Sequence, residues 1–193
     1  METIIYIVQR LRAIFKIYYF TWMARLIFTS RVSLKGVVCI GFPAIFKYPQ
    51  SEITIGKGSR LRSNDLGWTG MRCGSLLMQT FSANARIVVR DDVELNGVEI
   101  YCRSTTVEIG YGSILAPSVK ILDTDFHGQN EGLFKDDAGF SSDRPMFIGK
   151  NVWIGEGAII LKGATIGDNS IIGAHAVVSG TVGEGCVIAG NPG

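Results

Sequence analysis

Aliphatic residues recur at every sixth position in the C-terminal part of the chain. The repeat runs in phase through Ile148, Ile154, Ile160, Ile166, Ile172 and Val178. A second recurring site, mostly small, lies four residues after each of the first five: Val152, Ala158, Ala164, Ser170 and Ala176. A helix has a period of 3.6 and a sandwich strand alternates every two residues, so neither explains a period of six. After Val178 the phase slips, and it resumes at Val182 and Ile188.

The same pattern occurs earlier in broken form, from Ile55 to Leu61, from Ile87 to Val93, and from Ile109 through Leu115 to Ile121. Short strands joined by tight turns, with one aliphatic side chain per strand pointing inward, produce this spacing. The 24 glycines among 193 residues suit repeated turns. The pattern predicts an all-β solenoid over residues 36–193.

The rhythm stops for 26 residues between Ile121 and Ile148. A solenoid tolerates an insertion only where the inserted chain can leave the coil, so we expect an external loop at about 122–147. The loop contains His127, one of two histidines, together with Arg144 and several acids: Asp123, Asp125, Asp136, Asp137 and Asp143. A lone histidine at the start of a polar loop suggests a functional site.

Residues 1–35 form a separate segment that is apolar, aromatic and basic. The segment holds six basic residues and one acidic residue, whereas the whole chain has a net charge of +2. Its longest uncharged stretch, Ile17 to Ala24, is too short to span a bilayer. Two interpretations stay open: a helical segment that packs on the body or on a neighbouring subunit, or peripheral contact with a membrane.

Composition narrows the classes of function. The small net charge does not suggest nucleic acid as a partner. The four cysteines lack metal-ligand or redox spacing, and two histidines cannot form a three-histidine zinc site within one chain. We therefore expect no bound metal.

The stretch "MFIGKNVWIGEGAIILKGATIGDNSIIGAHAVVSG" resembles the hexapeptide-repeat acyltransferases. This resemblance implies a left-handed parallel β-helix. The segment "ILDTDFHG" resembles the catalytic segment of sugar O-acetyltransferases related to galactoside, maltose and surface-polysaccharide acetyltransferases, which implies that His127 is the general base. The residue type fits, because a sugar hydroxyl attacks a thioester only when a base removes its proton.

The same resemblance implies roles for other residues. Either Asp123 or Asp125 would orient His127, and Asp125 could equally contact the acceptor sugar. Asn96 would bind the acceptor near His127, although an asparagine before Gly97 is also a common turn residue. The acetyl donor would be acetyl-CoA, held in a groove between subunits of a homotrimer by Ala116, Trp153, Gly155, Ala174, Ser179, Ala189, Gly190, Asn191 and Pro192. Ser179-Gly180 departs from the usual Thr-Lys, which removes a cation near the CoA phosphates.

These observations predict an acetyl-CoA-dependent O-acetyltransferase that acts on a sugar hydroxyl in surface-polysaccharide biosynthesis. We expect direct transfer, because no cysteine or serine is clearly placed beside His127. The expected location is the cytoplasm; if residues 1–35 contact a membrane rather than pack on the protein, they would do so at the inner face of the cell membrane. Two alternatives remain: an N-acetyltransferase that acts on an aminosugar nucleotide, and a non-catalytic β-helix protein that binds partners.

Overall fold

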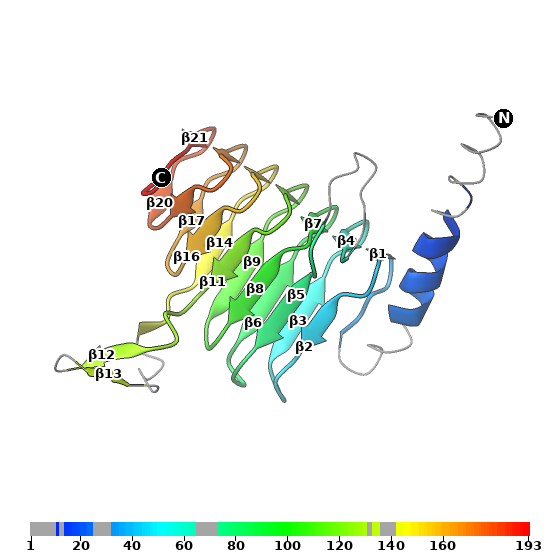
Figure 1. Cartoon of the computed structure of the whole chain (residues 1–193), viewed down its shortest axis with the longest axis horizontal. Helices are drawn as coiled ribbons and strands as arrows, with labels where there is room; N and C mark the ends of the chain where they lie inside the picture. The colour runs from blue at the N-terminus through cyan, green and yellow to red at the C-terminus, as the bar shows by residue number, and fades with distance from the viewer. Residues whose placement is uncertain (1–10, 12–13, 25–31, 65–72, 131–132, 136–141) are drawn as a thin grey trace.

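The computed structural model describes residues 11, 14–24, 32–64, 73–130, 133–135 and 142–193. In these residues the chain winds into a parallel β-helix with a helix at its N-terminal end (Figure 1). Three parallel sheets form the coil, and each turn contributes one strand to each sheet. A fourth, two-stranded sheet lies outside the coil.

Sheet A holds seven strands in the order β1 (Val38–Ile40), β4 (Arg60–Arg62), β7 (Glu94–Asn96), β10 (Ile114–Leu115), β15 (Trp153–Ile154), β18 (Ile171–Ile172) and β21 (Val187–Ile188). Sheet B holds β2 (Ala44–Phe46), β5 (Leu77–Thr80), β8 (Glu99–Cys102), β11 (Lys120–Leu122), β16 (Ile159–Leu161) and β19 (Val177–Val178). Sheet C holds β3 (Glu52–Ile55), β6 (Arg86–Val89), β9 (Thr106–Ile109), β14 (Met146–Ile148), β17 (Thr165–Ile166) and β20 (Thr181–Val182). We name the three corners AB, BC and CA after the sheets that they join.

The pairing register explains both the regular and the irregular parts of the sequence pattern. Leu115 pairs with Ile154, and Ile154 pairs with Ile172. The coil turn from Ile154 to Ile172 therefore has 18 residues, or three hexapeptides. Ile172 pairs with Ile188, only 16 residues later, because the BC corner after β19 is two residues shorter. This shortened corner is the physical reason for the phase slip after Val178.

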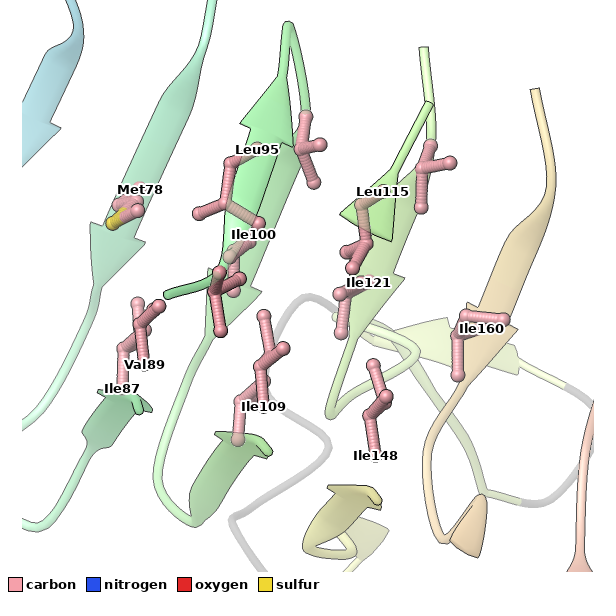
Figure 2. Close-up of a cluster of buried hydrophobic side chains, with 14 of the residues drawn as sticks. Met78, Ile87, Val89, Leu95, Ile100, Ile109, Leu115, Ile121, Ile148 and Ile160 are labelled. Carbon is pink, nitrogen blue, oxygen red and sulfur yellow. The ribbon is translucent and has the colours of Figure 1, made fainter. Parts of the chain in front are cut away.

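The aliphatic residues of the repeat form the core of the coil (Figure 2). Leu95, Leu115 and Ile154 are fully buried and pair directly across sheet A. Full burial of such a side chain contributes about 1.5–3 kcal/mol, so each turn gains stability from stacking on the next. The small residues of the second recurring site are also buried at the corners: Val152, Ala158, Ala164, Ser170 and Ala176.

The N-terminal helix, residues 14–24, closes one end of the coil. Thr21 Oγ1 accepts a hydrogen bond of 2.9 Å from Cys39 N and donates one of 3.2 Å to Cys39 O. These bonds satisfy the edge of β1 that has no neighbouring strand. Ala24 is fully buried, and the ring of Phe20 meets the ring of Phe42 edge-on. Within the described part of the chain, no helix has the length and apolarity needed to cross a bilayer.

The long interruption leaves the coil between β11 and β14. It contains a hairpin of β12 (Gly128–Asn130) and β13 (Leu133–Lys135), which pair antiparallel outside the coil. The prediction of a parallel β-helix with an N-terminal helical segment and one long external loop is thus confirmed. Residues 131–132 and 136–141, and with them Asp136 and Asp137, lie outside the described residues.

Candidate functional site

His127 lies just outside the BC corner of the coil, where the chain leaves β11. Its side chain is exposed, and its backbone N–H donates a 2.7 Å hydrogen bond to the carbonyl of Asp125. The tight turn at 125–127 places His127 within five residues of Leu122, the last residue of β11. The rigid coil therefore determines where this histidine emerges.

Phe126 fixes the backbone immediately before His127. Its φ is +62°, in the left-handed region that side chains other than glycine rarely adopt. Its ring packs edge-on against Phe81 and Tyr101, with centroids 5.3 and 6.1 Å away. Its N–H donates to Thr124 Oγ1 at 3.1 Å. Such strain persists only when the surroundings determine the conformation, and it concentrates at functional sites.

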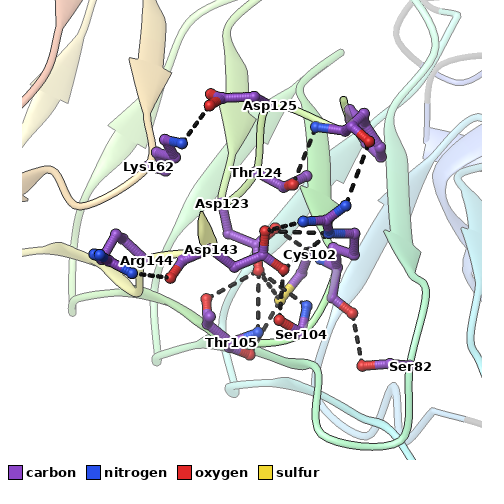
Figure 3. Close-up of polar contacts among 12 residues, drawn as sticks. Ser82, Cys102, Ser104, Thr105, Asp123, Thr124, Asp125, Asp143, Arg144 and Lys162 are labelled. Atoms are coloured by element: carbon purple, nitrogen blue, oxygen red, sulfur yellow. Dashed lines mark hydrogen bonds and ion pairs between the residues drawn. The ribbon is translucent and has the colours of Figure 1, made fainter. Parts of the chain in front are cut away.

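Asp123 is fully buried and binds the BC corner of the preceding coil (Figure 3). Its carboxylate accepts hydrogen bonds from the backbone N–H groups of Arg103 (2.7 Å), Ser104 (3.2 Å) and Thr105 (3.1 Å). Thr105 Oγ1 donates a further bond of 2.9 Å. The oxygens of Asp123 thus hold a turn together, which makes Asp123 a structural anchor of this corner.

Asp143 and Arg103 join the end of the external loop to the same corner. Arg103 Nη2 donates to Asp143 Oδ1 at 2.6 Å, and Arg103 Nε donates to Asp143 Oδ2 at 2.9 Å. Ser104 Oγ donates a short bond of 2.5 Å to Asp143 Oδ2. Both members of this ion pair are buried. Arg103 Nη1 also donates to the carbonyl of Phe126 at 3.4 Å, so one guanidinium holds both ends of the loop.

The environment of Asp143 favours its ionised form. Burial opposes ionisation, but hydrogen bonds from Arg103, Ser104 and Thr124 outweigh it, and the pKa of Asp143 falls below its ordinary value of 3.8. The carboxylate is therefore charged at neutral pH, and its partner Arg103 keeps a complementary charge.

Asp125 is more than half exposed and forms an ion pair with Lys162. Lys162 follows β16 at the BC corner of the next coil, directly above the start of the loop. An exposed pair of this kind contributes little stability. Asp125 is therefore available for contact with a ligand, and Lys162 brings a cation to the surface beside it.

Cys102 is the cysteine nearest to this cluster. Its Sγ lies 3.6 Å from Asp123 Oδ2. Burial, aided by the charge of Asp123, raises the pKa of Cys102 to about 12. A thiol in this state is not a nucleophile at neutral pH, which removes Cys102 as a carrier of an acyl group.

Most of the predicted donor-side residues stack along the AB corner. The backbone N–H of Ala116 donates a 2.9 Å hydrogen bond to the carbonyl of Ile154, and the N–H of Gly155 donates one of 2.7 Å to the carbonyl of Ile172. These bonds align the corner positions of successive turns. Ala174 and the turn from Ala189 to Pro192 continue this edge and are exposed, whereas Ala116 is half-buried and Gly155 is buried. Ser179 is the exception, because it follows β19 at the BC corner.

Trp153 lies on the outer face of sheet A beside this edge. Its side chain is 55% exposed. In register with it lie three other exposed apolar residues, so the outer face carries the ladder Ile114, Trp153, Ile171 and Val187. An apolar strip next to a line of small corner residues offers a surface on which a long, partly apolar ligand could lie.

Asn96 and His127 lie at different corners of the coil, on the two sides of sheet B. Asn96 ends β7 at the AB corner, where its Nδ2 donates to Leu115 O at 2.9 Å. His127 follows β11 at the BC corner. The three residues of β11 alone span about 10 Å at roughly 3.3 Å per residue. One chain therefore does not bring the expected acceptor-side asparagine to the histidine.

Several residues of this cluster were not singled out from the sequence: Arg103, Ser104, Thr105, Phe126 and Lys162. One weak signal was present. Arg103 follows a buried strand in "EIYCRSTTVEIG", where the hexapeptide spacing is broken, and a charge at such a position needs a partner. Among the described residues, no three His, Cys, Asp or Glu side chains are grouped so that they could hold a metal ion.

Comparison with known proteins agrees with this architecture. Residues 145–180 match the family described as "Bacterial transferase hexapeptide (six repeats)". No curated protein sequence matches the chain. Among solved structures, the polysialic acid O-acetyltransferase OatWY is similar with a TM-score of 0.54 and 22% identity, over 78% of this chain and 82% of that chain.

A second similar structure is AntD, an N-acyltransferase from Bacillus cereus, in complex with dTDP and 3-hydroxybutyryl-CoA. It has a TM-score of 0.62 and 15% identity, over 82% of this chain and 77% of that chain. At these identities the likeness concerns the fold. Residues 145–180 therefore consist of bacterial transferase hexapeptide repeats, and the chain has the parallel β-helix fold of these two acyltransferases.

Proposed function

We propose that this protein transfers an acetyl group from acetyl-CoA to a hydroxyl of a sugar, with His127 as general base. The observation that carries the proposal is the position of His127. It is exposed, it lies just outside the rigid hexapeptide coil, and its backbone is held by Phe126 and Arg103. A base must be held in a defined orientation to remove a proton efficiently.

The chemistry requires only groups that this chain and its substrates supply. The imidazole of His127 takes the proton of the sugar hydroxyl as the oxygen attacks the thioester carbonyl. The tetrahedral intermediate then collapses, the carbon–sulfur bond breaks, and the imidazolium returns the proton to the CoA thiolate. No acyl-enzyme forms, in keeping with the high pKa of Cys102.

The donor would lie along the AB corner, with Trp153 against the pantetheine arm and Ala116, Gly155, Ala174 and residues 189–192 along the edge. Ser179 lies at the BC corner, so it would contact the donor only from there and not along the AB edge. The exposed apolar ladder beside Trp153 supports this placement. OatWY and AntD, which share the fold, are named as acyltransferases that act on a polysaccharide and bind an acyl-CoA, respectively.

We further propose that the active site lies between subunits of a homotrimer. Within one chain, Trp153 and Asn96 lie on the AB side of sheet B, whereas His127 lies on the BC side. A neighbouring copy whose AB corner faces the loop would bring the two halves together. Closed rotational symmetry provides the same contact three times.

The test compares two histidines. We expect the His127→Ala variant to lose acetyl transfer by about 10²- to 10⁴-fold, the usual contribution of a general base, while its affinity for CoA stays unchanged. The matched control is His175→Asn, which alters an exposed histidine in a turn whose positive φ of 56° asparagine accepts. Retention of full transfer by the His127→Ala variant would remove the proposed base.

The same assay identifies the product. An ester is expected, and hydroxylamine releases acetyl groups from an ester but not from an amide. A product stable to hydroxylamine would redirect the proposal to the amino group of an aminosugar nucleotide. Surface-polysaccharide repeats and nucleotide sugars are the acceptors to compare.

A further inference from the structure

The N-terminal helix presents an exposed stripe of large apolar side chains. Thr21 and Ala24 mark its inner face, where Thr21 bonds Cys39 and Ala24 is fully buried. On another face of the helix, at the spacing i, i+4, i+7 and i+11, come Leu11, Phe15, Tyr18 and Trp22. We call these four residues the outer stripe. Their exposed fractions are between 59% and 74%.

Exposed apolar side chains concentrate at this end of the molecule. Of the 15 large apolar side chains that are exposed in the described part of the chain, nine lie between residues 11 and 48. An apolar groove also runs between the helix and the first strand, and two residues of the outer stripe, Tyr18 and Trp22, lie along it. Concentrations of this kind mark contact surfaces rather than ordinary solvent-exposed faces.

The helix lies beyond β1 at the end of the coil, roughly crosswise to the direction in which the turns stack (Figure 1). Its inner face rests on the first turn, and the outer stripe, which begins at the rim of the groove, is exposed at this end of the molecule. In an assembly whose coils run side by side in one direction, every copy would present this surface on the same side. An end surface that all copies present on the same side suits a partner with an extended, flat surface.

The charge of the segment indicates which partner. Residues 1–35 contain six basic residues and one acidic residue, and Lys16 and Lys35 are exposed. A second copy of the same segment would bring like charges together, whereas an anionic lipid surface attracts them. Tyrosine and tryptophan beside lysine and arginine are the side chains that settle in the interface of a bilayer.

We propose that this end of the protein docks on an anionic membrane surface, with the outer stripe in the lipid interface. The helix lies on the bilayer and the coil projects from it. A membrane-bound acceptor, such as a sugar carried on a lipid, would then be close to the enzyme. The docking itself does not depend on acetyl transfer and is measured without substrate.

The test is sedimentation of the full chain with phosphatidylcholine vesicles, with and without phosphatidylglycerol. Binding is expected only to the anionic vesicles. It is expected to weaken at 1 M salt, where the screening length falls to about 3 Å. The Phe15→Ser/Trp22→Ser double variant should bind at least about tenfold more weakly. Tyr111→Ser, which removes an exposed aromatic ring far along the coil, should bind like the unaltered protein.

Two results would overturn the proposal. One is equal binding by the double variant and the unaltered protein. The other is a change in assembled mass, measured by light scattering, with no change in vesicle binding, since the stripe would then contact a second copy. Should the double variant not fold, Lys16→Glu/Lys35→Glu replaces it, because both side chains are exposed and charge reversal must weaken binding to anionic vesicles.

Discussion

Arg103 and Asp143 form a buried ion pair that spans 40 residues of sequence and joins the corner of one coil to the end of the external loop. The guanidinium contacts the carboxylate through Nε and Nη2, a two-point geometry that fixes both side chains. The same guanidinium reaches the carbonyl before His127. The pair therefore couples the folding of the loop to the position of the candidate base.

Removal of either partner alone should be costly. Arg103→Met or Asp143→Leu leaves one buried charge without its partner, and we expect each to lower the free energy of unfolding by about 3–5 kcal/mol. The double variant should lose much less than the sum, because no uncompensated charge remains. Denaturant unfolding of all four proteins at one concentration measures this coupling, and additive losses would contradict it.

The pair should also make stability depend on pH. The pKa of Asp143 is lowered in the folded state, so its contribution is complete above the pKa of the unfolded chain, near 3.8, and is lost as pH falls through the lower folded value. Thermal midpoints measured between pH 6 and pH 2, at intervals of about one pH unit, should fall more steeply for the unaltered protein than for Asp143→Asn. Parallel curves would show that this carboxylate does not contribute.

Asp123 and Asp125 offer a matched comparison of a buried and an exposed carboxylate. Asp123→Asn sets an amide against backbone N–H groups that need an acceptor, so we expect a loss of about 2–4 kcal/mol in stability. Asp125→Asn removes an exposed ion pair with Lys162 and should cost less than about 1 kcal/mol. Equal losses from the two substitutions would contradict the assignment of Asp123 as an anchor.

The fold could be predicted because every turn of the coil repeats one physical requirement. Successive turns bury an aliphatic residue at the same position, as Leu115, Ile154 and Ile172 do, and this leaves a period in the sequence. The start of the external loop could be predicted for the same reason, because the period stops after Ile121.

The internal arrangement of the site could not be predicted in this way. Arg103 meets Asp143, and Phe126 meets Phe81, through contacts made once, between corners and a loop, and such contacts leave no period. The resemblance indicated that Asp123 or Asp125 serves His127. Asp123 is buried at a corner whereas Asp125 is exposed, and only a three-dimensional structure reveals this difference. The same holds for Asn96, whose distance from His127 depends on which corner of the coil each residue occupies.

Asp125 should affect catalysis more than stability. It is exposed beside His127 and is held towards the next coil by Lys162. If it contacts the acceptor, Asp125→Asn raises KM for the sugar about tenfold or more, at nearly constant kcat. If it orients the base, kcat falls and KM stays constant. Steady-state kinetics with varied acceptor separates the two roles, and unchanged values of both would exclude Asp125 from the site.

A mixture of two inactive variants tests whether one site needs two chains. His127→Ala lacks the candidate base, and Trp153→Ala lacks the ring expected against the donor; because Trp153 is 55% exposed, its removal should leave the fold intact. Each variant alone should have little activity. When the two are unfolded and refolded together, sites that draw His127 from one chain and Trp153 from its neighbour regain both groups at about a quarter of positions by random assembly. Recovery of activity to that level places the site between subunits, whereas no recovery from well-folded mixed assemblies places both residues in the same chain's site.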